Sequence, residues 1–255
     1  MISLVVVGAA GRMGRAVLET AGADAVFHVK GGVDPSPRPG WAGDLPWGED
    51  LSRLLARGDV VVEFGGPEAA GQSARACEAA GAGLVSGSTG LTQQQQAAVD
   101  QAATKVAVLR AANFSLGVLA LRQALQAALP GLAGWDVEIV ERHHRLKKDS
   151  PSGTALQLAA EVDAARTSTA SSLRHGRDGS VGPRPLHEIG VHAVRGGTWV
   201  GDHTVLLAGE GEWLELRHVA QDRSAFARGA LQAARFVAAA SPGLYHLEAA
   251  ATHTS

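Results

Sequence analysis

Cysteine is almost absent from this sequence, in which Cys77 is the single one among 255 residues. It cannot form a disulfide within the chain, and it has no second thiolate with which to build a metal cluster. We therefore predict a chain that folds in a reducing compartment, the cytoplasm, that has no metal site, and that is stabilised by packing alone.

Excess charge and long apolar segments are missing as well. The chain has 23 Lys and Arg residues against 25 Asp and Glu, a net charge of -2, so it has no electrostatic means of holding nucleic acid or an anionic membrane. No apolar run approaches the roughly 20 residues that a membrane span needs, and the first residues enter a strand directly rather than a signal peptide. These absences exclude nucleic acid and membranes as the main partners.

Lysine is scarce, because arginine supplies most of the positive charge. The four lysines are Lys30, Lys105, Lys147 and Lys148. Two of them are adjacent, and they lie in the segment with the densest set of chemically active side chains.

The N-terminal half alternates short apolar runs with helical segments. The runs are continuous, which is typical of strands covered on both faces. Strand and helix alternation predicts an α/β fold with a Rossmann-type, doubly wound parallel sheet. The expected strands are 2–7, 26–33, 60–64, 84–86 and 106–109, and the expected helices are 12–21, 67–80 with Pro67 in its first turn, and 92–103 with Thr92 as N-cap.

The pattern changes after a helical stretch at 117–128. The strands expected from there on are 135–141, 188–195, 203–208 and 213–219, and the Gly-rich connection 209–211 indicates a hairpin. We predict a smaller α+β domain with a mixed or antiparallel sheet at 116–222, which binds substrate and, because few helices cover its sheet, favours association. Residues 1–115 and 223–255 would form the dinucleotide-binding domain, closed by a helix at 224–240 with Ser224 as N-cap.

A glycine-rich turn joins the first strand to the first helix. It runs through Gly8, Ala9, Ala10, Gly11, Arg12, Met13 and Gly14. Gly8 permits the tight turn, Gly11 lets the backbone approach a pyrophosphate, and Gly14 allows close packing of helix on sheet. The helix N-terminus offers N–H groups to phosphates. A glycine triplet suits any tight turn, but its place in a βαβ unit favours dinucleotide binding.

Asp34 ends the second strand, where an acid accepts hydrogen bonds from an adenosine ribose. A carboxylate would repel a 2′-phosphate, which favours NAD(H) over NADP(H), although Arg38 lies close enough in sequence to restore NADP(H) binding. Asp34 would equally suit a turn before Pro35. Later strand ends at 64–67, 87–89 and 111–114 lie where an open α/β sheet binds ligands, and each could also be an ordinary turn.

The segment 141–155 combines a strand end, a cationic loop and a helix start. It brings histidines able to exchange protons near pH 7, a lysine donor and a helix N-terminus into one small volume, which would suit a carboxylate substrate. We expect Ser150 as the N-cap and Pro151 at the first helical position. A solvated basic loop ahead of a capped helix explains the same spacing.

In this segment the sequence resembles the dihydrodipicolinate reductase family, also called 4-hydroxy-tetrahydrodipicolinate reductases, of the diaminopimelate route to lysine. The matching pieces occur in the family's order along nearly the whole chain. They are the glycine turn 8–14, 111–115, 141–155, 190–204 with Arg195 and Gly201, and 226–230. The resemblance implies an NAD(P)H-dependent reductase of a cyclic dicarboxylate imine, assembled as a homotetramer.

The resemblance also implies roles for individual residues. His143 would be the catalytic proton donor and acceptor and Lys147 the proton donor, whereas Lys148 is not at the family's lysine position. His144, Gly153 and Thr154 would hold a substrate carboxylate. The dinucleotide would be lined by Gly8, Ala9, Ala10, Gly11, Arg12, Met13, Asp34, Gly87, Ser88, Thr89, Ala111, Ala112, Asn113 and Phe114. Three other histidines, His192, His203 and His218, are expected to be structural or surface residues.

Two departures from the family pattern concern the cofactor. Pro35 follows Asp34 where an arginine is common, which removes the obvious ligand of a 2′-phosphate, and Gly65 and Gly66 replace an expected hydroxyl residue. Two other functions remain open on the fold alone. A dehydrogenase of an amino acid or a sugar would share the nucleotide domain without the 143–154 segment, and a dinucleotide sensor would bind NADH without catalysis.

Overall fold

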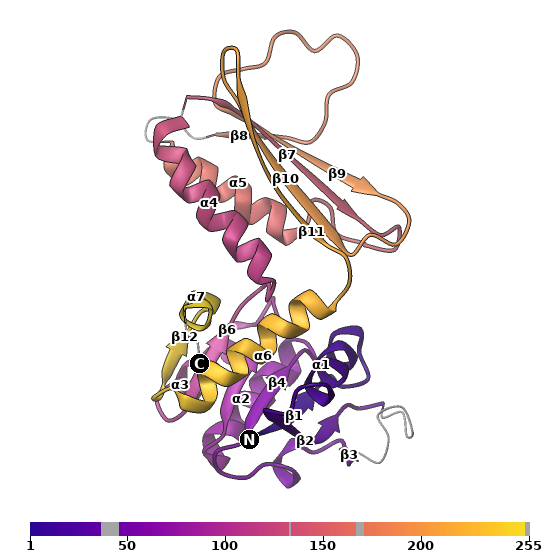
Figure 1. Cartoon of the computed structure of the whole chain (residues 1–255), viewed down its shortest axis with the longest axis vertical. Coiled ribbons are helices and arrows are strands. Elements are labelled where there is room, and N and C mark those ends of the chain that lie inside the picture. Colours follow the sequence, from indigo (N-terminus) through magenta and orange to yellow (C-terminus); the bar gives the residue numbers. More distant parts are fainter. Residues whose placement is uncertain (37–45, 133, 167–170, 253–255) are drawn as a thin grey trace. The chain divides into compact units, whose positions relative to one another are not determined.

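A computed structural model of the chain describes residues 1–36, 46–132, 134–166 and 171–252. The chain divides into two compact units, Met1–Leu116 with Arg223–Ser255, and Gly117–Asp222 (Figure 1). Among the described helices, none has both the length and the apolar character to cross a membrane.

The first unit is built on a parallel sheet with the strand order β12-β6-β5-β4-β1-β2-β3. Its central strands are fully buried, with Val5 and Val61 both at 0% exposure, because helices cover both faces. The predicted doubly wound sheet is confirmed. Its strands are β1 (Ile2–Val7), β2 (Phe27–Val33), β3 (Trp47–Gly48), β4 (Val60–Glu63), β5 (Gly83–Ser86), β6 (Ala107–Arg110) and β12 (Gly243–Tyr245).

The helices of this unit pack in pairs, α1 against α6 and α2 against α3. Thr92 is the N-cap of α3, as predicted, and the structure adds a capping box with Gln95; Pro67 begins α2. The predicted cap of α6 is wrong, since Arg223 occupies the N-cap position and Ser224 is the first helical residue. The helices are α1 (Arg12–Gly22), α2 (Pro67–Ala80), α3 (Gln93–Ala103), α6 (Ser224–Ala239) and α7 (Leu247–Ala251), with a 3-10 turn at Leu51–Arg53.

The second unit has a mixed sheet in the order β11-β10-β7-β9-β8. The strand β10 runs antiparallel to both neighbours, whereas β7, β9 and β8 are parallel to one another. The predicted mixed sheet is confirmed. The elements are α4 (Leu116–Leu132), β7 (Asp136–His143), α5 (Gly153–Ala165), β8 (Ser172–Arg174), β9 (Glu188–Arg195), β10 (Gly201–Ala208) and β11 (Trp213–Ala220).

The helices α4 and α5 cover one face of this sheet (Figure 1). Along β7 the side chains alternate between the two faces, and Val137 and Ile139 enter the core with Leu125 of α4 and Leu158 of α5. The same two-residue period continues to the end of the strand. Residues 141 and 143 therefore lie on the helix side, where α5 begins.

Candidate active site

Glu141 and His143 form a hydrogen-bonded pair at the end of β7. The His143 Nδ1 atom lies 2.6 Å from Glu141 Oε2. Both residues are buried, with Glu141 at 0% and His143 at 9% exposure. The predicted strand stopped at residue 141, but the observed strand extends to His143, so the ring is held by sheet backbone rather than by a loop.

Arg195, on the neighbouring strand β9, binds Glu141 with both ends of its guanidinium group. Its Nη1 donates to Oε2 at 2.7 Å and its Nη2 to Oε1 at 2.8 Å. The same Nη2 donates to the backbone oxygen of Asp149 at 2.8 Å. Arg195 therefore ties the strand pair to the loop between β7 and α5.

Lys147 lies in that loop and pairs with Asp149. Its Nζ is 2.7 Å and 2.9 Å from the two carboxylate oxygens. The lysine side chain is 20% exposed and that of Asp149 is 62% exposed. The hydrogen bond from Lys147 lowers the pKa of Asp149, which stays ionised beside the amine. The adjacent Lys148 is exposed.

The helix α5 starts two residues later than predicted. Ser152 is the N-cap and its Oγ accepts a hydrogen bond from Ala155 N at 3.2 Å, so the expectation of Ser150 as N-cap is wrong. The reason is that Ser152 N donates to the buried Glu141 Oε1 at 3.0 Å, which fixes residue 152 at the site and moves the helix start to it. Gly153 and Thr154 consequently occupy the first turn, and space around Gly153 is open.

His144 begins the loop and is half-buried. Its backbone N–H donates to Trp199 O at 2.8 Å, and its carbonyl accepts from Lys147 N at 3.1 Å. These bonds turn the chain directly after β7. The predicted residues His143, His144, Lys147, Gly153 and Thr154 therefore all lie within one strand end, one turn and one helix start of the second unit.

His203, on β10, completes the buried group. Its ring meets that of His143 edge to face, with centroids 5.2 Å apart, and its Nε2 lies 3.1 Å from Ser152 Oγ. Burial, with a further contribution from His143, lowers the pKa of His203 to about 4. Burial alone would raise the pKa of Glu141, but hydrogen bonds from His143, Arg195 and Ser152 N lower it to about 2. At neutral pH the site thus holds a carboxylate and a neutral His203.

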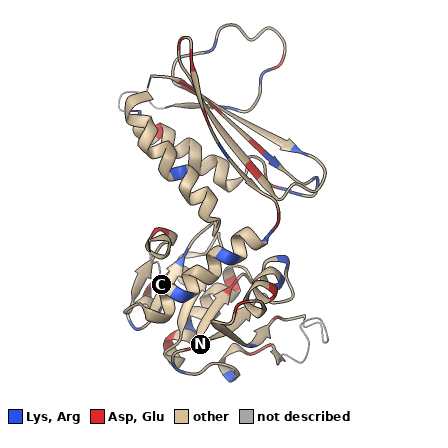
Figure 2. Cartoon of the chain, viewed as in Figure 1, with Lys and Arg blue, Asp and Glu red and all other residues tan. Residues whose placement is uncertain are grey.

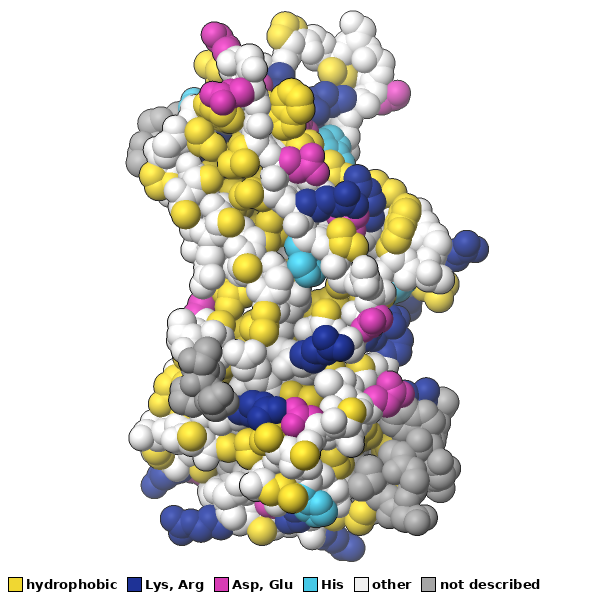
Figure 3. Space-filling view, in the orientation of Figure 1, with side chains coloured by type: hydrophobic (Ala, Val, Ile, Leu, Met, Phe, Trp, Pro, Cys, Tyr) yellow, Lys and Arg dark blue, Asp and Glu magenta, His cyan; other side chains and the backbone are white. Residues whose placement is uncertain are grey.

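Charges of both signs are close together in this unit. Figure 2 shows acidic and basic positions side by side on the strands of the mixed sheet. On the face drawn in Figure 3, a group of basic side chains lies on this unit with acidic and histidine side chains around it. A local group of cations suits a small dianion even though the whole chain is nearly neutral.

The glycine turn of the first unit is closed as tightly as its sequence predicts. Gly8 has a φ of +74°, and its N–H donates to Val33 O at 2.9 Å. A Cβ on Gly14 would lie 2.2 Å from Gly8 O, and a Cβ on Gly8 would lie 2.7 Å from the backbone of Phe64. Gly11 is the N-cap of α1, with no side chain over the helix end. This leaves the helix N-terminus open to a phosphate group.

Asp34 binds the turn directly. Its Oδ2 accepts from Ala10 N at 3.0 Å and its Oδ1 from Ser36 N at 3.0 Å. The carboxylate therefore lies beside the glycine turn, and each oxygen keeps a second lone pair for another donor. Arg38, the candidate for an NADP(H) contact, lies outside the described residues.

Glu63, at the end of β4, organises the neighbouring strand ends. It is 0% exposed and accepts hydrogen bonds from Gly65 N at 2.6 Å and from Ser86 Oγ and Ser88 Oγ, both at 2.7 Å. The same Ser88 Oγ accepts from Gly66 N at 2.9 Å. One buried carboxylate thus shapes both the Gly65–Gly66 turn and the predicted 87–89 turn.

The remaining predicted cofactor residues follow β6. Phe114 is 2% exposed and meets Phe64 edge to face at 5.6 Å. Ala111 N donates to Ser86 O at 3.3 Å, and Asn113 Oδ1 accepts from Ser115 N at 2.8 Å. The turns after β1, β4, β5 and β6 are therefore joined to one another at the carboxyl edge of the sheet, which includes the point where the strand order reverses.

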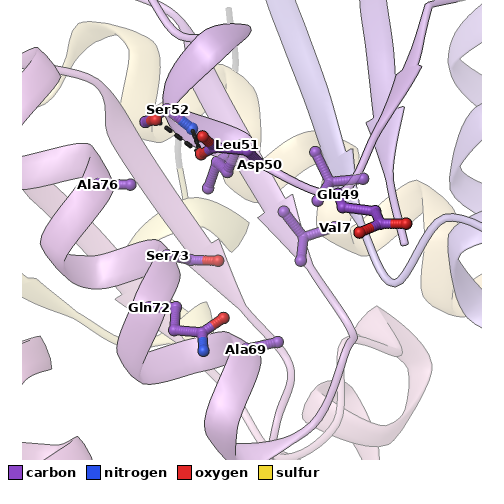
Figure 4. Close-up of a pocket in the computed structure, with 10 residues that line it drawn as sticks. Val7, Glu49, Asp50, Leu51, Ser52, Ala69, Gln72, Ser73 and Ala76 are labelled. Carbon is purple, nitrogen blue, oxygen red and sulfur yellow. Dashed lines mark hydrogen bonds between the residues drawn. The ribbon is translucent and has the colours of Figure 1, made fainter. Parts of the chain in front are cut away.

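A pocket of about 290 Å³ lies beside this edge, between α2 and the ends of β1 and β2. Figure 4 shows Gln72 and Ser73 of α2 facing the 49–52 segment across it, with Val7 at its side. It is lined by Val7, Val33, Glu49, Asp50, Leu51, Ser52, Ala69, Gln72, Ser73 and Ala76. Apolar walls with a few polar groups match a planar heterocycle and its sugar.

Three residues of the proposed active site and cofactor turns had no predicted role, namely Glu63, Glu141 and Arg195, and a fourth, His203, was expected to be a structural or surface residue. The spacing of Glu141 and His143 is a usable signal, because residues i and i+2 of a strand share a face. No comparable signal of spacing exists for Arg195 and His203, which reach the site from other strands. Glu63 is a buried acidic side chain at a strand end, and only the fold shows that Ser86 and Ser88, at the end of β5 and just after it, bind it.

Two family models match the chain in succession. The model described as dihydrodipicolinate reductase, N-terminus matches residues 2–114, and that described as dihydrodipicolinate reductase, C-terminus matches residues 117–250. A 4-hydroxy-tetrahydrodipicolinate reductase from Thermomicrobium roseum is 45% identical over 97% of this chain and 98% of its own. The one from Myxococcus xanthus is 42% identical over 97% and 96%.

Solved structures share the fold. Dihydrodipicolinate reductase from Paenisporosarcina sp. TG-14, whose structure contains dipicolinate, superposes with a TM-score of 0.78 at 23% identity over 96% of this chain and 97% of that one. The diaminopimelate (DAP) dehydrogenase of C. glutamicum gives 0.56 at 13% identity over 99% and 96%. Because different dehydrogenases share this architecture, the fold by itself does not select the substrate.

Proposed function

The chain belongs to the dihydrodipicolinate reductase family, and from this premise we propose that the 141–155 segment of the second unit binds and protonates the substrate and that the turns of the first unit bind a dinucleotide. The activity that follows from membership is the NAD(P)H-dependent reduction of 4-hydroxy-tetrahydrodipicolinate to tetrahydrodipicolinate, in the diaminopimelate route to lysine. The observation that carries the assignment of the site is the hydrogen-bonded set of Glu141, His143 and Arg195 beside the start of α5.

The first unit fits a dinucleotide. Side chains on Gly8 or Gly14 would collide with neighbouring backbone, and the uncapped start of α1 presents N–H groups and Arg12 to a pyrophosphate. The pocket beside α2 would hold the adenosine. NADH or NADPH, when bound, supplies a hydride. The residues proposed to line it are Gly8, Ala9, Ala10, Gly11, Arg12, Met13, Asp34, Gly87, Ser88, Thr89, Ala111, Ala112, Asn113 and Phe114.

The second unit supplies the groups for a carboxylate substrate. Gly153 and Thr154 lie in the first turn of α5, where backbone N–H groups point out of the helix and the dipole favours an anion. His144 lies at the other end of the same loop, and its ring would contact the same carboxylate. His144, Gly153 and Thr154, at the two ends of this loop, would together fix the orientation of a cyclic dicarboxylate. Orienting the substrate is the main way in which such a site lowers the activation barrier.

His143 and Lys147 are the proposed proton-handling residues. Imidazole exchanges protons near neutral pH, and the amine of Lys147 is a donor held by an exposed carboxylate that a substrate carboxylate can replace. Loss of the 4-hydroxyl group as water would leave a conjugated imine. After hydride addition to its carbon-carbon double bond, protonation of the resulting enamine carbon by this group would complete the reaction and restore the imine. Lys148 is exposed and is assigned no part in it.

The charges around the proposed adenosine pocket favour NADH. Asp34 lies beside the pocket, since its N–H donates to Gly48 O, and Glu49 and Asp50 line the pocket. None of the described lining residues is Lys or Arg. Carboxylates accept hydrogen bonds from ribose hydroxyls and repel a 2′-phosphate. Changing Glu49 to Gln should therefore reduce the preference for NADH, measured as the ratio of kcat/KM with NADH to that with NADPH.

The test of the activity is the consumption of NADH and of NADPH, in separate reactions, with the product of dihydrodipicolinate synthase generated in the cuvette. The proposal expects turnover with NADH, and slower turnover with NADPH at equal concentration. A chain that binds NADH but consumes neither cofactor would contradict the function and favour a dinucleotide sensor.

The proposed assembly is a homotetramer formed through the uncovered face of the mixed sheet. That face presents Trp213, Val219 and Val194, which are 71%, 48% and 38% exposed. It lies opposite the face covered by α4 and α5. The proposed location is the cytoplasm, because the buried Cys77 needs no oxidising compartment.

A further inference from the structure

The partners of Glu141 are all hydrogen-bond donors. They are His143 Nδ1 at 2.6 Å, the two Nη atoms of Arg195 at 2.7 Å and 2.8 Å, and Ser152 N at 3.0 Å. A carboxylate only accepts hydrogen bonds. Because Glu141 is ionised at neutral pH, the proton of a neutral His143 ring must be on Nδ1.

The other ring nitrogen of His143 is then the one that exchanges protons. Nε2 lies beside Gly201 of β10, where a Cβ would meet it at 3.4 Å. Because residue 201 is a glycine, no side chain from it occupies the space next to Nε2. His203 packs edge to face against the same ring, and it is neutral at physiological pH. The ring is thus held in one plane by packing and in one tautomer by Glu141.

Arg195 connects the His143 ring to the loop that contains Lys147. It holds both oxygens of Glu141 and, through the same Nη2 atom, the backbone oxygen of Asp149 at 2.8 Å. The carboxylate of Asp149 holds Lys147 Nζ at 2.7 Å. A single guanidinium group therefore fixes both the strand end with His143 and the loop with Lys147.

We propose that Glu141 and Arg195 are positioning residues of the reductase, which lock His143 with Nδ1–H toward Glu141 and set its Nε2 and the Lys147 amine as one unit for proton transfer. The proposal rests on the function proposed above, in which His143 contacts the substrate. Neither residue needs to touch the substrate for this effect, because each acts through a neighbouring group.

Changing Glu141 to Gln tests the tautomer. The amide keeps the size of the side chain but replaces one accepting oxygen with an NH₂ group, so His143 Nδ1, Arg195 and Ser152 N compete for the single oxygen that remains. We expect kcat to fall by at least roughly 100-fold, because the histidine loses the carboxylate that orients it, with little change in the KM for NADH. The pH–rate profile should also shift toward lower pH, because a neutral amide no longer stabilises a positive ring.

The matched control is Glu161 changed to Gln. Glu161 is a partly buried acidic residue of the second unit, with a side chain 12% exposed. It lies on α5 and pairs with Arg122 of α4 at 2.5 Å. It has no contact with His143 among the described bonds. This variant should keep the wild-type kcat and pH profile. An equal loss in both variants would mean a general destabilisation and would overturn the positioning role of Glu141.

A second measurement does not depend on turnover. The ¹⁵N chemical shifts of the His143 ring distinguish Nδ1–H from Nε2–H, and the wild type should show Nδ1–H, while the Glu141 to Gln variant should show a mixture or Nε2–H. Arg195 changed to Lys should keep the tautomer but lower kcat, because one amine cannot hold Glu141 and Asp149 together. A wild-type ring protonated on Nε2 would overturn the proposal even if the reductase activity is present. An Nδ1–H ring in a chain without that activity would instead leave the tautomer lock in place and contradict the proposed function.

Discussion

His203 is a buried residue whose protonation the fold opposes. Burial lowers its pKa to about 4 from an ordinary value of 6.5. The unfolded chain therefore takes up a proton first as the pH falls, and the neutral ring stabilises the folded state fully only above about pH 6.5. One pKa unit corresponds to about 1.4 kcal/mol, so the loss between pH 6.5 and 4 can reach roughly 3 kcal/mol.

Urea titrations between pH 4 and 7 would measure this effect. The free energy of unfolding should fall as the pH is lowered across this range, and His203 changed to Gln should flatten the slope. Glu141 and Glu138, whose pKa values are lowered to about 2, add a separate loss that begins only below about pH 4.5. A slope between pH 6.5 and 4 that is unchanged in the His203 variant would contradict the assignment.

Some residues of the proposed active site could be predicted from the sequence and others could not. His143, His144, Lys147, Gly153 and Thr154 are contiguous enough to be recognised as one motif. Glu141 lies in the same segment, yet its role depends on strand pairing, because two of its four bonds come from Arg195, 54 residues away. Contacts between residues so far apart in the sequence depend on the register in which their strands pair. No local pattern in a single sequence determines that register.

At the scale of elements, the turn between β1 and α1 has a backbone that leaves no room for a side chain at two of its glycines, Gly8 and Gly14. A Cβ on Gly14 would lie 2.2 Å from Gly8 O, whereas a Cβ on Gly22, at the end of the same helix, meets nothing within 4 Å. Gly14 changed to Ala should therefore destabilise the chain by about 2 to 3 kcal/mol and weaken NADH binding, because the turn must move.

Gly22 changed to Ala is its control. It should leave NADH binding unchanged and keep or raise stability by up to about 1 kcal/mol, since alanine favours helix. Thermal unfolding and NADH fluorescence titration of both variants check the pair. Equal NADH affinity in the Gly14 variant and in the wild type would argue against a close approach of the dinucleotide to this turn.

Long elements were predicted better than short ones. The apolar run of β1 and the N-cap residue Thr92 of α3 identified these elements correctly, because burial on both faces and local hydrogen bonds leave a pattern in the sequence. The strands β3, β8 and β12 were missed, since each has only two or three residues. The start of α5 was misplaced because the contact of Ser152 with Glu141, a tertiary bond, decides it.

At the scale of the whole molecule, we predict that the uncovered face of the mixed sheet forms the interface between subunits. Trp213 is 71% exposed on β11, and Leu244, on the edge strand β12 of the first unit, is 43% exposed. Changing Trp213 to Glu should shift the sedimentation coefficient toward smaller species, because a charge replaces a large apolar contact. Leu244 changed to Glu should leave the assembly intact. A monomeric wild type would contradict the proposed tetramer.

The most direct test of the whole account is turnover of the Lys147 to Ala variant beside that of Lys148 to Ala, with the substrate generated in place and NADH as reductant. These two lysines are adjacent and equal in charge, but Lys147 alone is held at the site by Asp149. The account predicts that the Lys147 variant loses more than about 100-fold in kcat while its affinity for NADH is unchanged, and that the Lys148 variant stays near the wild type. Wild-type turnover in the Lys147 variant would contradict the assignment of the reductase chemistry to this segment.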